Sequence, residues 1–166
     1  MASALFVKTS DIAKHTALNG NVDADKFTQF VKIAQDISLQ NILGTDLYEA
    51  MDASIVASTL AGDYVTLNTT YIKPYLIHSA MVHYLPFAAY QIANRGVFKG
   101  GSENSTAIEK NELDYLVEAE RDISEHYAQR LIDYLCNNND LFSELNTNSD
   151  GDMKPDSDVT FSGWVL

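Results

Sequence analysis

The fold is decided by the stretch YIKPYLIHSAMVHYLPFAAYQIANRG, residues 71–96. It is the longest apolar run in the chain, and its formal charges, Lys73 and Arg95, lie near its two ends. Its apolar side chains go most of the way round a helix, which is typical of a helix packed on several sides. One helix of this length would run about 39 Å, enough to cross a small domain. We therefore expect a central helix over about 71–95.

Two prolines should shape this helix differently. Pro74 falls in or near the first turn, where a missing N–H costs little. Pro86 lies in the middle of the pattern and removes the bond to the carbonyl of Val82, so we expect a kink there. His78 and His83 would point about 140° apart on a helix. They are therefore interpreted as core histidines and not as metal ligands.

The segments around the central stretch also predict helices. Apolar residues from Phe27 to Ile42 recur at three- and four-residue steps, and Gly44 provides a stop. A further helix is expected over 46–55. The sequence Thr106–Glu109 has the form of a capping box before a long amphipathic helix that ends near Asn137. The fold class is mainly α, a bundle of roughly four to five helices around the kinked central helix.

Composition divides the chain into three parts. Residues 1–145 are expected to form the helical domain, which begins with an extended apolar N-terminal arm. Residues 146–158 are polar and without periodicity, which predicts a linker. Residues 159–166, VTFSGWVL, form an apolar C-terminal docking segment. We expect this segment to dock on its own domain or on a neighbouring subunit as an added strand.

Charge and cysteine content narrow the classes of function. The chain has 11 basic and 23 acidic side chains, a formal charge of −12. This excess of acidic residues disfavours binding to the phosphates of a nucleic acid. Its simplest effect is to keep the protein soluble. The single cysteine, Cys136, excludes an internal disulfide and is expected to be a small buried hydrophobe. The prolines, histidines and amides of the central stretch argue against a membrane helix.

No motif in the sequence predicts catalysis. The pattern Asn146-x-Asn148-x-Asp150-Gly151 resembles the start of a calcium loop. Its twelfth position, where a bidentate Glu is needed, is Ser157. Phosphate-binding loops, nucleophile elbows and kinase signatures are absent from the sequence. We therefore expect no enzyme, no bound metal and no cofactor.

Four pieces of the chain taken together have a familiar pattern. They are the arm LFV, the helix FTQFVKIAQDISLQNILGTDLYEAM, the helix YIKPYLIHSAMVHYLPFAAYQIANRGVF and the acidic helix ending YAQRLIDYLCNNNDLFSEL. The more specific parts are the turn from Leu43 to Tyr48 and the central helix from "YI-x-P" to "N-x-G-V". Over residues 5–145 this pattern resembles the head–tail adaptor (connector or ring) proteins of tailed bacteriophages. It is closest to those of Bacteroidetes-infecting and crAss-like phages.

The resemblance implies a virion structural protein at the head–tail junction, assembled in the host cytoplasm. Copies, commonly twelve, would form a ring beneath the portal protein and extend the DNA channel towards the tail. The implied partners are other copies of the chain, the portal protein, and tail or further ring proteins. DNA would pass through without specific binding, and no membrane is involved. The alternative is a monomeric or dimeric helical interaction module that docks a partner through its C-terminal peptide.

Two sets of residues are candidates for these contacts. Apolar groups at both ends of the chain are hypothesised to dock partners: Phe161, Trp164, Val165, Leu166, Leu5 and Phe6. Carboxylates on one face of the long amphipathic helix are hypothesised to line the lumen of the ring: Glu112, Glu118, Asp122 and Glu125. The alternative for the second set is an outer, solvated face.

Overall fold

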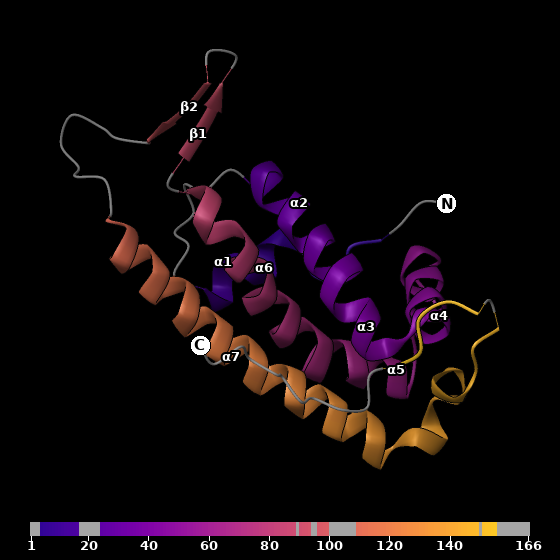
Figure 1. The fold of residues 1–166 in the computed structure, drawn as a ribbon. Coiled ribbons are helices and arrows are strands. Elements are labelled where there is room, and N and C mark those ends of the chain that lie inside the picture. The colour runs from indigo at the N-terminus through magenta and orange to yellow at the C-terminus, as the bar shows by residue number, and fades with distance from the viewer. Residues whose placement is uncertain are drawn as a thin grey trace.

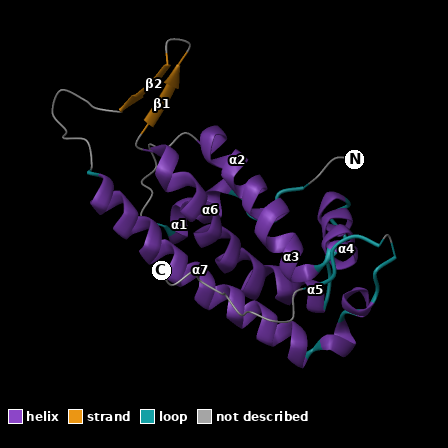
Figure 2. Cartoon of the chain, in the orientation of Figure 1, coloured by secondary structure: helices purple, strands orange, loops and turns teal. Residues whose placement is uncertain are grey.

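The chain folds as a mainly helical bundle, so the expected fold class is confirmed. The computed structural model describes residues 4–16, 24–88, 90–93, 96–99, 109–149 and 151–155. Helix α6 (Lys73–Ala88) packs between helix α2 (Ala24–Ala34) and helix α7 (Lys110–Asn137), as Figure 1 shows. A small two-stranded hairpin is set apart from the helices (Figure 2).

The other elements are short. They are α1 (Thr9–His15), a π-helical segment (Gln35–Leu39), α3 (Gln40–Leu43), α4 (Thr45–Val56), α5 (Asp63–Thr66), a second π-helical segment (Leu67–Ile72), β1 (Tyr90–Ala93), β2 (Gly96–Lys99) and two 3₁₀ turns (Asn139–Leu141 and Ser143–Asn146). The π segments join α2 to α3 and α5 to α6 without a break. The first of these two helical runs ends at Gly44, as expected. The φ of Gly44 is 74°, in the region that favours glycine.

The hydrophobic core lies where α2, α3, α4, α6 and α7 meet. Its most deeply buried side chains are Val31, Leu39, Leu43, Leu47, Met51, Leu67, Ile72, Leu76, Leu131 and Phe142. Burying a side chain of this size stabilises the fold by about 1.5–3 kcal/mol. The apolar residues of α6 face both α2 and α7, which is why that stretch has no single apolar stripe.

The central helix differs from the expected span of 71–95. Helix α6 ends at Ala88, and the chain then forms β1 and β2, an antiparallel hairpin in which Tyr90 pairs with Lys99 and Ala93 with Gly96. We expected Pro86 to kink the helix in its middle. It lies instead in the last turn of α6, two residues before the helix ends. The part of the expected helix from Tyr90 to Ala93 is therefore a strand.

The start of the central helix also differs from expectation. Residues 67–72, just before α6, form a π-helical segment that leads into it without a break. Pro74 therefore follows a helical run instead of opening one. A proline inside a helix removes a hydrogen bond and crowds the preceding turn. The π-helical segment before Pro74 is a local irregularity that accommodates the lost hydrogen bond and the crowding. The helical run accordingly begins at Asp63, after the turn at Gly62.

The polar stretch after α7 folds back on the bundle. We call residues 147–149 and 151–155 the return segment. Thr45, the first residue of α4, donates its backbone N–H to the carbonyl of Met153 (3.0 Å) and its hydroxyl to Asp152 Oδ2 (3.0 Å). The described part of the expected linker (146–158) is thus held against the bundle, and the helical domain extends past residue 145.

Asp46 and Gly44 fix the return segment at two further points. Asp46 Oδ2 accepts hydrogen bonds from the Thr147 hydroxyl (2.6 Å) and from the Ser149 N–H (3.0 Å) and hydroxyl (2.9 Å). These hydrogen bonds lower the pKa of Asp46 below its usual 3.8, and the bond from Thr147 has the largest effect. At Gly44, a Cβ atom would lie 2.7 Å from Cδ of Pro155, so the approach of the segment requires glycine there.

None of the helices among the described residues combines the length and the hydropathy needed to cross a bilayer.

Candidate functional site

Helix α7 is the main exposed element, and it runs antiparallel to α6. His78 contacts Glu120, whereas Tyr71, earlier in the chain, stacks on Tyr134, later in α7. The buried residues of α7 all lie in its C-terminal half: Ser124, Ala128, Leu131, Ile132 and Leu135. The half from Lys110 to Ile123 has no fully buried residue, although it contains the apolar residues expected to face the core.

One flank of α7 is apolar along the whole helix. At about 100° per residue, Leu116, Ile123, Tyr127 and Tyr134 lie on one side, next to the buried face. We call these four residues the apolar flank. Tyr134 stacks on Tyr71 with ring centroids 3.9 Å apart, and Tyr127 stacks on the His78 ring at 5.5 Å.

The first two residues of the apolar flank are exposed. Leu116 is 43% exposed and Ile123 is 40% exposed. Tyr115 is 71% exposed, but it lies about 100° round the helix from Leu116, on the side of Glu118 and Asp122. Apolar groups gathered in this way on a surface mark interaction sites more often than isolated ones do. This half of α7 is therefore the strongest candidate for a contact with another protein.

The opposite flank of α7 is acidic. Glu118, Asp122 and Glu125 recur at steps of four and three residues, which brings their carboxylates to one side of the helix. We call these three residues the acidic flank. Glu118 and Asp122 are exposed, and Glu125 is half-buried. The expected acidic face is thus present for three of its four predicted members.

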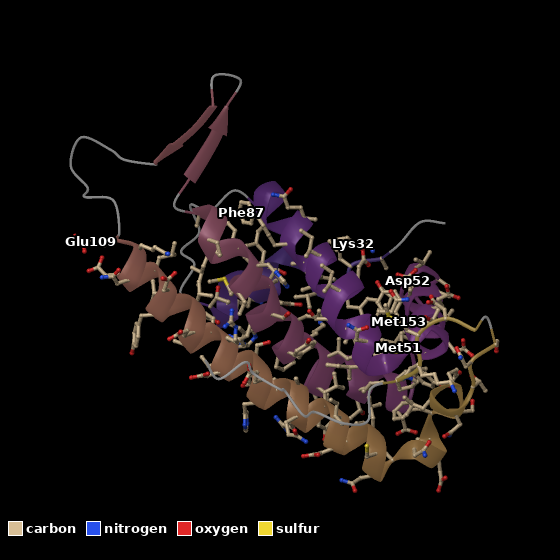
Figure 3. All side chains as sticks on the ribbon, in the orientation of Figure 1. Lys32, Met51, Asp52, Phe87, Glu109 and Met153 are labelled. Carbon is tan, nitrogen blue, oxygen red and sulfur yellow. The ribbon has the colours of Figure 1, made fainter. Side chains whose placement is uncertain are left out.

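Glu112, the fourth predicted member, has a different role. Its Oε2 accepts a hydrogen bond from the backbone N–H of Glu109 (3.1 Å), and the Glu109 side chain accepts from the third helical residue in return. This is a capping box, but it lies three residues later than the box predicted at Thr106–Glu109. Thr106 lies outside the described residues. Figure 3 shows Glu109 at the start of α7.

A polar pair joins α6 and α7 inside the bundle. His78 Nδ1 lies 2.7 Å from Glu120 Oε2, and the two side chains are 15% and 19% exposed. The sequence predicted His78 as a core histidine, and the structure pairs it with Glu120 of α7. Sequence spacing offers no signal for this pair, because its members are 42 residues apart. Burial lowers the pKa of the other core histidine, His83.

The N-terminal arm packs on its own domain. The Phe6 side chain is 2% exposed and its ring stacks on Tyr48 at 5.4 Å. The Phe6 N–H donates to Gln35 Oε1 (2.9 Å), and Gln35 Nε2 donates to the carbonyl of Ala4 (3.1 Å). Leu5 is half-buried against the same core. In this structure Leu5 and Phe6 therefore belong to the core of their own chain and are not exposed docking groups.

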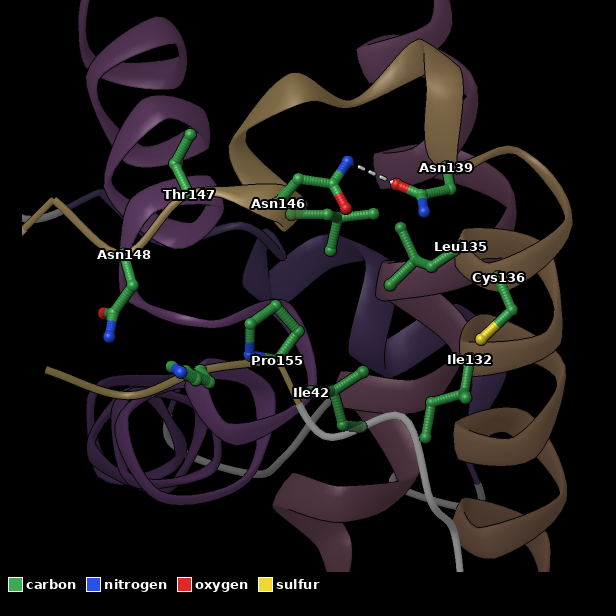
Figure 4. A pocket seen from close by; sticks show the side chains of 11 residues that line it. Ile42, Ile132, Leu135, Cys136, Asn139, Asn146, Thr147, Asn148 and Pro155 are labelled. Carbon is green, nitrogen blue, oxygen red and sulfur yellow. Dashed lines mark hydrogen bonds between the residues drawn. The ribbon is translucent and has the colours of Figure 1, made fainter. Parts of the chain in front are cut away.

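A cavity lies at the other end of α7. It is formed by α3, the last turns of α7 and the return segment, and Figure 4 shows it from close by. Cys136 lines the cavity and is exposed, so the expected burial of this cysteine is wrong. The remaining predicted docking residues, Phe161, Trp164, Val165 and Leu166, lie outside the described residues.

A comparison with known families matches residues 39–154, most of the chain, to DUF6712. The chain belongs to the DUF6712 family, a family of unknown function. No curated protein matches the chain, and neither does any solved structure. The DUF6712 region contains α4, α6, the hairpin and α7, and it ends within the return segment. Both flanks of α7 and most of the cavity thus belong to the part of the chain that defines the family.

Proposed function

We propose that this DUF6712 protein is a virion structural protein, a head–tail adaptor whose copies form a ring between portal and tail. The proposal rests on the resemblance described above, and its main structural support is the apolar flank of α7. A ring needs a head-to-tail interface between different surfaces of neighbouring copies. The exposed residues Leu116 and Ile123 provide apolar area for one side of such an interface. The proposed role involves neither a reaction nor a cofactor.

The hairpin gives a second support. Strands β1 and β2 pair with each other and extend away from the helical bundle (Figure 1). A two-stranded hairpin is at best marginally stable in water unless it packs against something else. Contact with a neighbouring copy would supply this packing.

The acidic flank fits the wall of a DNA channel. Glu118, Asp122 and Glu125 would repel phosphates, so DNA could pass without binding. We propose that this flank borders the lumen and that the apolar flank, on the other side of α7, meets the neighbouring copy. An image reconstruction of the assembled ring tests the assignment. If the three carboxylates point outwards, the lumen assignment is wrong.

Assembly itself is tested by light scattering over a concentration series, with and without portal protein, using Leu116→Glu and Ile123→Glu variants. A charge placed in the apolar contact should weaken assembly at least about tenfold, which corresponds to ~1.4 kcal/mol. Val56→Glu on α4 is the matched control, because Val56 is also apolar and 52% exposed but lies away from α7. It should assemble as the wild type does.

The opposite outcome would favour the alternative function. A chain that stays monomeric at every concentration and does not bind portal protein would be an interaction module. In that case the Leu116→Glu and Val56→Glu variants should behave alike in the scattering experiment.

A further inference from the structure

The cavity at the end of α7 has an apolar interior and a polar rim. Its volume is about 390 Å³, within the range of small-ligand pockets. Ile42 from α3, Ile132 and Leu135 from α7, and Pro155 from the return segment supply the apolar surface (Figure 4). Asparagines and Lys154 supply the rim. A site of this kind suits an apolar side chain whose backbone can form hydrogen bonds at the rim.

The course of the chain indicates where such an occupant comes from. Pro155 lines the cavity, and the chain continues from it into the apolar segment 159–166. Trp164 lies nine residues after Pro155. Nine residues span at most about 30 Å, so the tryptophan can reach the cavity by folding back over a short tether. A short tether gives an effective concentration in the millimolar range, far above that of a second copy in dilute solution.

We propose that residues 159–166 fold back onto the cavity of their own chain and that an aromatic side chain, Trp164, fills it. The indole ring offers a large, rigid apolar surface, and the cavity offers the apolar side chains of Ile42, Ile132, Leu135 and Pro155. The docked segment covers Cys136 at the edge of the cavity. This inference does not depend on ring formation, because it concerns a contact within one chain.

The chain provides a probe on each side of the proposed contact. Trp164 is its only tryptophan and Cys136 is its only cysteine. The first experiment measures tryptophan emission and its quenching by acrylamide in the full chain. We expect blue-shifted, protected emission in the wild type and solvent-exposed emission in Cys136→Arg. Asn137→Arg is the matched control, because Asn137 is exposed on the same helix outside the cavity, and it should leave the emission unchanged.

The second experiment measures the rate at which Ellman's reagent modifies Cys136 in the full chain and in Trp164→Ala. Docking by a short tether should protect the thiol, and Trp164→Ala should raise the rate at least about tenfold. Adding the peptide VTFSGWVL to a chain that lacks residues 159–166 should restore protection as its concentration rises. Circular dichroism confirms that each variant keeps its helical fold.

Three outcomes would overturn the proposal. The first is solvent-exposed tryptophan emission in the wild type. The second is equal Cys136 reactivity in the wild type and Trp164→Ala. The third is protection that appears only as protein concentration rises, which would place the segment in the cavity of a neighbouring copy.

Discussion

The two halves of α7 share an apolar flank but differ in what covers it. In the C-terminal half, Tyr127 and Tyr134 stack on rings from the preceding helical run, His78 and Tyr71. Arg130 adds a cation over the Tyr71 ring at 5.2 Å. In the N-terminal half, Leu116 and Ile123 occupy equivalent positions on the helix and remain exposed.

The difference shows what an apolar pattern in a sequence means. It marks a face that is stable when buried, but it does not say which molecule buries it. In the C-terminal half that partner is the chain's own bundle. In the N-terminal half the flank stays partly exposed in the described part of the chain, and we have proposed that a neighbouring copy covers it. Four experiments, each with its own comparison of variants or pH values, test this contrast between the halves.

The largest effect is expected when one leucine in each half is truncated: Leu131 on the buried face and Leu116 on the apolar flank. Leu131→Ala should lower the free energy of unfolding by about 2–5 kcal/mol, because Leu131 is fully buried and leaves a cavity. Leu116→Ala should have a much smaller effect, because Leu116 is 43% exposed and its truncation leaves no enclosed cavity. Urea denaturation of the single chain measures both. Equal losses would mean that the N-terminal half is packed within the chain.

The next effect concerns the pair at the boundary between the halves. Glu120→Ala removes the partner of His78 and should cost about 1–3 kcal/mol, because a partly buried ring nitrogen loses its hydrogen bond. Glu118→Ala, on the acidic flank, is the control and should cost less than about 0.5 kcal/mol. Thermal unfolding followed by circular dichroism compares them. If the two variants melt at one temperature, the His78–Glu120 contact does not stabilise the bundle.

A smaller and local effect is expected at the start of α7. Glu109→Ala removes the N-cap and should weaken the first turns by about 0.5–2 kcal/mol. Because these turns are little packed, the loss should appear as faster amide exchange near residues 110–117, with global unfolding unchanged. Glu112→Gln keeps an acceptor for the Glu109 N–H and should exchange almost as slowly as the wild type. A lower global stability in Glu109→Ala would show that the two halves unfold together.

The smallest effect is a pH dependence at the return segment, which helps to cover the C-terminal half. The pKa of Asp46 is lowered on folding, so its contribution is present above the usual value of 3.8 and is lost as the pH falls through the folded pKa. Amide exchange in residues 147–155 should therefore increase below about pH 3.8. Asp46→Asn should remove this pH dependence and loosen the segment at neutral pH. If the amides of this segment stay protected from exchange in the wild type at low pH, the hydrogen bonds of Thr45 hold the segment in place instead.

Several features of the fold follow from short-range patterns. The helical run that ends at Gly44 was predictable, because apolar spacing and glycine position are local properties. The hairpin was not, since a short apolar run around Asn94 fits a helix end and a strand pair equally well. The capping box was placed three residues early because Thr106-x-x-Glu109 and Glu109-x-x-Glu112 both fit the pattern.

The candidate surfaces were predicted only in part. Spacing correctly places Glu118, Asp122 and Glu125 on one side of α7, because a single helix determines it. The same argument failed for Cys136, which lies at the edge of the apolar face next to the cavity. It also failed for the N-terminal arm, whose burial depends on Gln35 and Tyr48 in other elements.

The sequence by itself determined the helical class, the acidic flank of α7 and the helix ends at Gly44 and Asn137. Each of these depends on residues within one or two helical turns. Only the tertiary structure decided that the arm and the return segment pack on the bundle, that His78 meets Glu120, and that half of the apolar flank stays uncovered. The Thr45–Asp152 hydrogen bond spans 107 residues, and no local pattern encodes a contact over that distance. Such contacts form because the packed helices bring distant residues together.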